Sequence, residues 1–159
     1  MASIKGIEIK NIKTFRGVEY PVNYQGNIYY NGKKLGFWSQ DSWGGPDSYD
    51  FNTGELDQIA KDYYGPDSIY DLDCLIDEVL TLKNYEKSYK KAVKDGFLTL
   101  AVVTDGYSEI AIKITSKVDK EDIIKDYRQY IDKYVDKSTS RLRDNVKIYA
   151  FKSLSDFIM

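Results

Sequence analysis

The chain has 159 residues, of which 42% are hydrophobic, and a formal charge of −2. This length and composition predict one domain with a buried core. The sequence has no histidine, so it lacks the commonest general base and cannot form a triad that needs one. Cys74 is the single cysteine, which excludes an internal disulfide and a structural zinc site. No glycine-rich phosphate-binding motif is present. We therefore expect a protein that is not an enzyme, needs no cofactor and acts by binding another macromolecule.

The sequence also predicts where the protein is found. No window approaches the eighteen apolar residues of a membrane span, and Met1–Lys5 lacks the apolar run of a secretory signal. We expect a cytoplasmic protein with neither a membrane nor a small-molecule substrate as its partner.

The first forty residues predict β-structure. A β-branched run over 3–15 is typical of a strand, with a bulge where the alternation slips. The segments 24–30 and 33–39 flank Asn31-Gly32, the dipeptide favoured in a type I′ turn, so they predict a hairpin. In that hairpin we expect the alternating Ile28 and Tyr30 to face Leu35 and Phe37.

The middle of the chain predicts helices. One runs over 55–64, with Leu56, Ile59, Ala60 and Tyr63 turned inward, and ends at Gly65-Pro66. Asp67 or Ser68 is expected to cap a second helix, and a segment over 84–94 follows or continues it, ending before Gly96. The apolar stripe of the second helix is expected to consist of Ile69, Leu72, Leu75, Ile76, Val79 and Leu80.

The last third predicts a second hairpin, 97–104 and 107–115, around Asp105-Gly106. Leu98, Leu100 and Val102 are expected on one side, opposite Ile110, Ile112 and Ile114. A helix from Asp119 to about Lys137 follows, with Ile123, Tyr127, Tyr130, Ile131 and Tyr134 on one face. A polar linker over 138–143, a strand over 145–152 and a tail with one helical turn complete the chain. Because the strands are grouped, we predict a single α+β domain over 1–159, with a mostly antiparallel sheet of five to six strands and three to four helices packed on it.

Acidic residues are concentrated in the segment 50–82, which contains nine acidic residues and one basic residue. With the apolar stripe turned inward, Asp73 and Asp77 project outward one helical turn apart. Asp71 and Glu78 flank them, and Asp62 lies on the exposed side of the preceding helix. This face is either simply solvated, or it attracts a basic partner surface by electrostatic steering.

The segment 40–52 predicts a loop that carries interface residues. Trp43 beside two glycines either folds back over the core or is presented to a partner, and Tyr49 lies close behind it. Asp41 is a third candidate for partner binding. Asp41, Asp47 and Asp50 fit turn chemistry better than a hard-cation site, because their spacing does not match an EF-hand. We therefore expect no metal site.

Two groups of lysines support an alternative function. Lys33 and Lys34 follow the first turn, and a basic helix face could contact phosphate groups through Lys87, Lys90, Lys91 and Lys94. Arginine is scarce and stacking aromatics are not interleaved with these lysines, so direct nucleic-acid binding is the second hypothesis.

The stretch GNIYYNGKKLGFWSQDSWGGPD, residues 26–47, resembles small proteins of phages and mobile elements of low-GC Gram-positive bacteria. In size and composition the chain is similar to the type II-A anti-CRISPR proteins of staphylococci, and over residues 3–52 it looks like one that docks on the HNH nuclease domain. The resemblance implies a stoichiometric inhibitor of the guide-RNA-loaded type II effector nuclease. Such an inhibitor would hold the HNH domain away from the DNA strand and so block cleavage, without catalysis or a cofactor.

Overall fold

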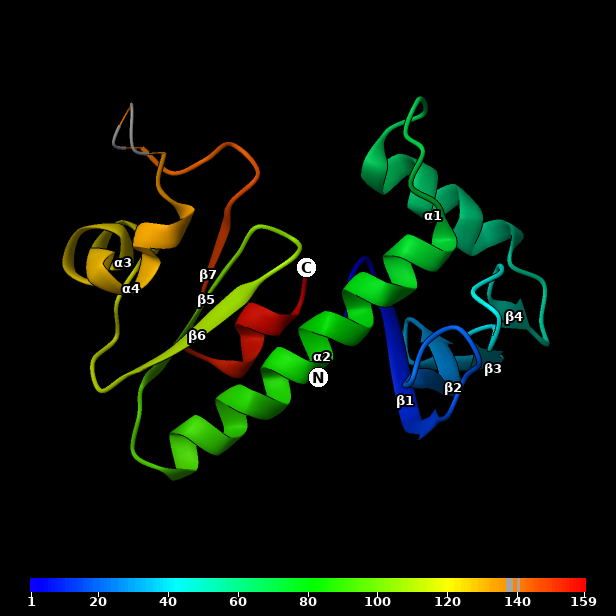
Figure 1. The fold of residues 1–159 in the computed structure, drawn as a ribbon. Helices are drawn as coiled ribbons and strands as arrows, with labels where there is room; N and C mark the ends of the chain where they lie inside the picture. The colour runs from blue at the N-terminus through cyan, green and yellow to red at the C-terminus, as the bar shows by residue number, and fades with distance from the viewer. Residues whose placement is uncertain (137–138, 140) are drawn as a thin grey trace. The chain divides into compact units, whose positions relative to one another are not determined.

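The computed structural model describes residues 1–136, 139 and 141–159. The chain divides into two compact units, residues 1–84 with 157–159 (unit 1) and residues 85–156 (unit 2). The boundary falls inside the longest helix, α2 (Leu72–Lys94), drawn in green in Figure 1. The predicted α+β class is confirmed, because the described residues form four α-helices and seven strands in two antiparallel sheets. A single domain stays a prediction, since compact units can fold together or separately.

Unit 1 contains a four-stranded sheet in the order β1-β2-β3-β4. Its hairpin has the predicted turn, because Asn31 and Gly32 adopt φ values of 47° and 80°. The bulge expected in the first strand is present as a register shift between Lys10 and Lys13. The strands are β1 (Ile7–Phe15), β2 (Asn23–Tyr30), β3 (Lys33–Ser39) and β4 (Ser48–Tyr49).

A second bulge corrects the predicted facing of the hairpin residues. Ile28 pairs with Gly36 and Tyr29 with Lys34, which leaves Leu35 without a partner on β2. The extra residue reverses the alternation of β3. Trp38 is therefore fully buried, whereas Phe37 is 40% exposed.

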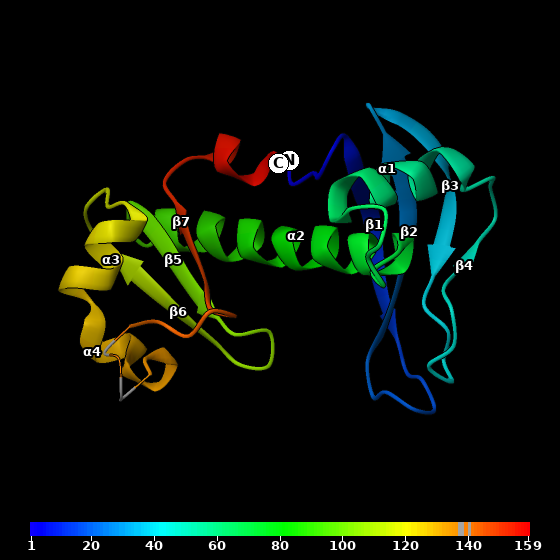
Figure 2. The same cartoon turned by 90° about the horizontal axis from the view of Figure 1, so that it is seen from above.

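Helix α1 (Gly54–Tyr64) and the first part of α2 cover this sheet (Figures 1 and 2). α2 begins later than predicted. Asp71 accepts a hydrogen bond from the backbone N–H of Cys74 and so caps the helix in place of Asp67 or Ser68. Ile69 precedes the helix and is 90% exposed, so its assignment to the apolar stripe is wrong. The buried side chains of these elements are Ile7, Ile9, Ile28, Trp38, Leu56, Ala60, Leu72, Leu75, Ile76 and Val79.

The two ends of the chain lie side by side in unit 1 (Figure 2). The backbone N–H of Ser3 donates to the carbonyl of Phe157, and the N–H of Met159 donates to the carbonyl of Ser3, each at 2.9 Å. The expected helical turn of the tail is the 3₁₀ helix η2 (Leu154–Phe157).

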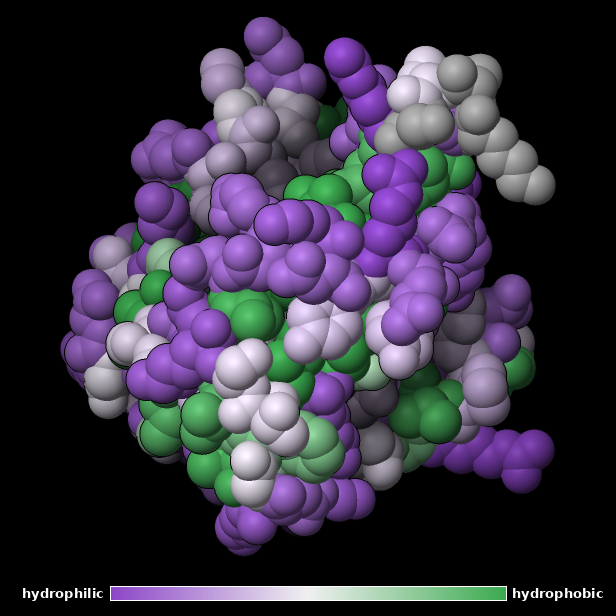
Figure 3. All heavy atoms as spheres, turned by 90° about the vertical axis from the view of Figure 1, so that its left-hand side faces the viewer, coloured by the Kyte–Doolittle hydropathy of each residue, from purple (hydrophilic) through white to green (hydrophobic). Residues whose placement is uncertain are grey.

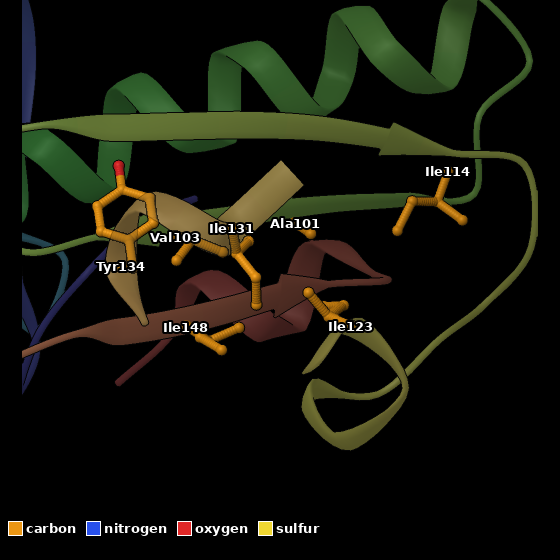
Figure 4. Close-up of a cluster of buried hydrophobic side chains, with 7 residues drawn as sticks. All are labelled: Ala101, Val103, Ile114, Ile123, Ile131, Tyr134 and Ile148. Carbon is orange, nitrogen blue, oxygen red and sulfur yellow. The ribbon is translucent and has the colours of Figure 1, made fainter. Parts of the chain in front are cut away.

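Unit 2 is a three-stranded sheet, ordered β6-β5-β7, with side chains packed on both faces of its central strand. On one face, Ala101, Val103 and Ile148 pack against Ile123, Ile131 and Tyr134 (Figure 4). On the other face, Leu100 lies opposite Phe151, whose ring is 5.9 Å from that of Tyr85 on α2. The elements are β5 (Thr99–Thr104), β6 (Glu109–Ile114), β7 (Lys147–Phe151), α3 (Lys120–Asp126), α4 (Arg128–Ile131) and the 3₁₀ helix η1 (Asp132–Tyr134).

Two sequence predictions in unit 2 are corrected. The long helix predicted from Asp119 is broken at Tyr127, where φ is −114° and ψ is 17°, and Tyr130 is half-exposed instead of buried. Ile112 lies opposite Ala101, so the isoleucines of β6 share a face with the odd-numbered residues of β5 and not with Leu100. The end of the predicted helix at Lys137 and part of the predicted linker, 138 and 140, lie outside the described residues.

On the face of unit 2 shown in Figure 3, hydrophilic side chains surround smaller hydrophobic patches.

Candidate functional site

An open pocket of about 500 Å³ lies in unit 1, lined by three segments of the chain. One wall is the β1–β2 connection, including Tyr20 and Val22. The second is the loop between β3 and β4, residues 40–47, which we call the acidic loop. The first turns of α2 supply Asp73 and Asp77. The acidic loop contributes Asp41 and Asp47, so four carboxyl groups line one pocket.

The acidic loop is held by hydrogen bonds to both of the other walls. The backbone N–H groups of Val18 and Glu19 donate to the carbonyl of Ser42 at 2.7 and 3.1 Å. The Gln40 amide accepts from the backbone N–H of Tyr24 at 2.9 Å and donates to Oδ1 of Asp77 at 3.0 Å. These bonds connect β2, the loop and α2 around the pocket.

One aspartate of this region, Asp41, has the turn role that the sequence favoured. The carboxylate of Asp41 accepts from the backbone N–H groups of Trp43 and Gly45 at 3.2 and 3.0 Å. Short side chains that bond their own loop in this way are typical of turns. Asp50 differs, because it accepts from the N–H of Phe37 on β3 and so joins two distant segments of the chain.

Asp47 connects the pocket to the core. Its Oδ2 accepts a 2.6 Å hydrogen bond from the indole N–H of the buried Trp38. Its own backbone N–H donates to Oδ2 of Asp73 at 2.9 Å, and the other oxygen of Asp73 accepts from the Tyr49 hydroxyl at 2.7 Å. One carboxylate on α2 thus holds both ends of the short segment 47–49.

This arrangement changes the acidity of the groups in it. Burial, reinforced by the negative charges of Asp73, Asp77 and Asp71, raises the pKa of Asp47 to about 7, although the Trp38 hydrogen bond opposes the change. Burial also raises the pKa of Asp77, with a smaller contribution from Asp73. The pKa of the Tyr49 hydroxyl is raised by burial and by its bond to Asp73. Near neutral pH, Asp47 is therefore a carboxyl group poised between its two protonation states.

Large apolar side chains are exposed on two of the segments that line the pocket. Trp43 is 72% exposed, so of its two alternatives the structure contradicts folding back over the core, while presentation to a partner stays a prediction. Val18, Tyr20 and Val22 on the neighbouring β1–β2 connection are 63%, 57% and 50% exposed. We call these four residues the apolar rim. Large exposed apolar side chains on neighbouring segments are typical of interaction sites.

The structure brings only some of the predicted site residues together. Asp41, Asp73 and Asp77 line the pocket, but Asp73 does not project freely outward as expected, because two donors from the segment 47–49 occupy it. Tyr49 is half-buried beneath the loop, with its hydroxyl on Asp73. Asp71 caps α2 and acts on the pocket through its charge.

Asp62 and Glu78 lie elsewhere on unit 1. Asp62 accepts from the side chain of Gln58 at 2.8 Å and lines a smaller hollow with Lys5 and Tyr30. Glu78 accepts from the hydroxyl of Tyr63 at 3.1 Å and so joins α2 to α1. These two carboxylates do not line the acidic pocket.

Sequence reasoning missed the central place of Asp47 and Gln40. The sequence identified Asp47 only as a turn residue or a cation ligand and gave Gln40 no role. The hydrogen bond from the Trp38 indole to Asp47 could not be predicted from the alternation of β3, because Trp38 points inward only as a result of the unpredicted bulge at Leu35. The contacts of Asp47 with Asp73 and of Gln40 with Asp77 arise only because the acidic loop folds onto α2.

The described residues contain neither a cluster of metal ligands nor a membrane-spanning helix. Within 1–136, 139 and 141–159, no three or more cysteine, aspartate or glutamate side chains are arranged to hold a metal ion. None of the helices in the described part of the chain is both long and apolar enough to cross a bilayer. Comparison of the chain with protein-family models, curated proteins and solved structures gave no match.

Proposed function

We propose that this protein inhibits a type II RNA-guided DNA nuclease by binding it directly, at or near the HNH domain, so that DNA is not cleaved. The observation that carries the proposal is the apolar rim around a pocket lined by four carboxyl groups. The resemblance of residues 3–52 to staphylococcal anti-CRISPR proteins supplies the partner. The protein acts by occupying a surface and needs no catalytic group.

The two parts of this surface suit different features of such a partner. Trp43 and Tyr20 are exposed aromatic side chains, which bury much area with few rotamers to immobilise and often dominate binding energy. The carboxyl groups complement the positively charged channel in which a guided nuclease holds nucleic acid. Unit 1 has eight basic and thirteen acidic residues, a formal charge of −5, which would attract such a channel over a longer range.

Removal of the most exposed rim residue tests the proposal. A purified staphylococcal type II effector with its guide RNA is titrated with wild-type protein, Trp43→Ala or Tyr107→Ala, and DNA cleavage and co-migration on size exclusion are measured. Tyr107 is the matched control, since it is 98% exposed at a hairpin end in unit 2. Trp43→Ala should weaken inhibition about tenfold or more, as an interface anchor would, and Tyr107→Ala should not. Full cleavage with separate elution of wild-type protein would refute the proposal.

A second pair of variants tests the charge. Asp77 lines the pocket, whereas Asp67 is exposed before α2 and does not line it. Asp77→Asn and Asp67→Asn each remove one negative charge, so they alter long-range steering alike and differ only at the pocket. Weaker inhibition by Asp77→Asn alone places the contact at the pocket, and equal inhibition by both variants would remove the pocket from the account.

The alternative function is nucleic-acid binding by an accessory protein of a phage or mobile element. One observation favours it, because unit 2 has fifteen basic and twelve acidic residues and exposes Lys87, Lys91 and Lys94 on α2. Lys90 belongs to this group in sequence, but its ammonium is paired with Glu86 at 2.6 Å. A gel shift that weakens steeply with salt would support this alternative, and no shift at micromolar protein and low salt would dismiss it.

A further inference from the structure

The strand β6 forms an open edge of the sheet in unit 2. It ends the strand order β6-β5-β7, so β5 lies on one side of it and no strand of the described chain lies on the other (Figure 1). Its side chains alternate, since Glu109, Ala111 and Lys113 are exposed, whereas Ile110 and Ile112 are half-buried against the core of unit 2. An uncovered edge strand is a template on which another strand can pair.

The backbone groups that face the open edge are those of the three exposed residues. The N–H of Asp105 donates to the carbonyl of Ser108 at 3.2 Å, so these two residues are a hydrogen-bonded pair of the hairpin. Bonded and non-bonded pairs alternate along an antiparallel ladder. Counted from this pair, the even-numbered residues of β6 bond to β5, and the N–H and C=O groups of the three exposed residues point away from it. No other segment of the described chain supplies a hydrogen bond to these groups.

The side chains make this edge complementary to itself. When two copies pair antiparallel with Ala111 opposite Ala111 of the second copy, Glu109 of each copy faces Lys113 of the other. Opposite charges in directly opposed positions stabilise a strand pair, and like charges destabilise it. On the other face of the sheet, the same register sets Ile110 against Ile112 and so joins two half-buried apolar side chains.

Other registers and the other edge lack this match. Antiparallel pairing shifted by two residues leaves both charges opposite neutral residues, and parallel pairing in register sets each charge against its own copy. β7, at the opposite edge of the sheet, contains Lys147 as its one charged residue, so its charge pattern does not match itself.

The two charged side chains are available for pairing between copies. The Tyr85 hydroxyl donates to Oε2 of Glu109 at 2.8 Å, and the second carboxylate oxygen can accept from a lysine. The ammonium of Lys113 has three donors and lies 3.4 Å from Asp95 in an exposed ion pair, which contributes little to stability.

We propose that the protein self-associates through β6, with two copies related by a two-fold axis at Ala111. The outward N–H and C=O groups of the three exposed residues bond across this axis and join the two three-stranded sheets of unit 2 into one. A contact made mainly by one pair of six-residue strands is smaller than the interface of a permanent dimer, so association depends on concentration. This self-association concerns unit 2 and is independent of the surface proposed above to bind a nuclease.

Charge reversal at the edge tests the register. Sedimentation velocity of the full chain is measured from about 10 µM to about 1 mM, the range of a weak dimer. The wild-type protein should shift from monomer to dimer, whereas Glu109→Lys and Lys113→Glu should each stay monomeric because like charges then face each other. An equimolar mixture of these two variants should dimerise, since each supplies the charge that the other lacks. Lys147→Glu on β7 is the matched control and should dimerise as the wild type does.

Amide exchange in the wild-type protein locates the contact without any variant. As the fraction of dimer rises with concentration, exchange of the Ala111 amide with solvent should slow, because its N–H becomes bonded. The amides of Ile110 and Ile112 are bonded to β5 at every concentration and are the internal references. A monomer at all concentrations, a dimer that the mixture of variants does not restore, or an Ala111 amide whose exchange ignores concentration would overturn the proposal.

Discussion

The indole Nε1 of Trp38 donates a 2.6 Å hydrogen bond to Oδ2 of Asp47. Trp38 lies on β3 and is fully buried, whereas Asp47 lies on the acidic loop that leads to β4. The bond therefore connects a residue that lines the pocket to the core of unit 1. Because Trp38 is out of contact with water, no solvent molecule replaces Asp47 as its acceptor without rearrangement.

Replacing Trp38 by phenylalanine should destabilise the protein. The smaller ring removes the donor and leaves the partly buried Asp47 without its bond, which costs about 1–3 kcal/mol, and the lost ring volume adds to this cost. Urea unfolding followed by circular dichroism measures the change. Trp43→Phe is the matched control, and because Trp43 is exposed its effect should stay within about 0.5 kcal/mol. Equal effects of the two variants would contradict the role given to the Trp38–Asp47 bond.

Stability should fall as the pH rises from about 4 to 7. The folded protein raises the pKa of Asp47 from its ordinary 3.8 to about 7, so between these values the folded state binds a proton that the unfolded state has released. The stabilisation is complete below pH 3.8 and is lost as the pH rises through 7. Asp47 is partly solvated, so we expect the free energy of unfolding to fall by about 1–2 kcal/mol over this range, which is less than the full pKa change of Asp47 would imply.

Thermal melts of the wild-type protein and Asp47→Asn at pH 4.5, 5.5, 6.5 and 7.5 test this sign. The curve of the variant should be flatter over this range, because the group that loses its proton is gone. Asp105 and Asp156 have lowered pKa values, chiefly through hydrogen bonds from their own turns, so they act in the opposite direction and below about pH 4. A wild-type stability that rises between pH 4.5 and 7.5 would show that the environment of Asp47 is not as described.

Asp73→Asn should lower the pKa of Asp47. Among the charges that raise this pKa, Asp73 has the largest effect, and the variant removes that charge. Its amide keeps only one acceptor oxygen, so it also loses one of the two hydrogen bonds that Asp73 accepts from the backbone N–H of Asp47 and from the Tyr49 hydroxyl. Followed by the NMR signal of the Trp38 indole N–H, which donates to Asp47, the midpoint of the Asp47 titration should move down. Asp67→Asn, which removes a charge outside the pocket, should leave the midpoint in place. A midpoint that does not respond to either variant would mean that burial alone sets the acidity of Asp47.

Gly36→Ala should destabilise unit 1. A Cβ added at Gly36 would lie 2.1 Å from Oδ1 of Asp50 and 2.7 Å from a ring carbon of Phe51, so the segment that follows the acidic loop would have to shift. A clash of this kind typically costs about 1–3 kcal/mol. The control is Gly54→Ala at the start of α1, where the nearest atom apart from the adjoining residues and the backbone of the helix is Oδ1 of Asn52 at 3.2 Å and the helix favours alanine. Chemical denaturation measures the free energy of unfolding of both variants, and only that of Gly36→Ala should fall. A Gly36→Ala protein as stable as the wild type would show that the contact is not tight.

The local elements of the fold could be predicted from the sequence, because their causes are local. Asn31-Gly32 determines its own turn, and Gly65 ends α1 at the predicted place since both act through the backbone of a few residues. The acidic character of α2 and the loop chemistry of Asp41 could also be predicted from neighbouring residues. The grouping of strands gave the α+β class.

Only the tertiary structure decided the pocket. The bulge at Leu35, which no local pattern marked, turns Trp38 inward and so gives Asp47 its donor. The sequence placed Asp73 on a solvated face, but the return of the acidic loop onto α2 turned it into an acceptor for the segment 47–49. Burial of a carboxyl group among other carboxyl groups depends on segments that are 26 residues apart in the chain. Their charges interact strongly only because folding brings them within a few ångströms of one another and removes water from between them.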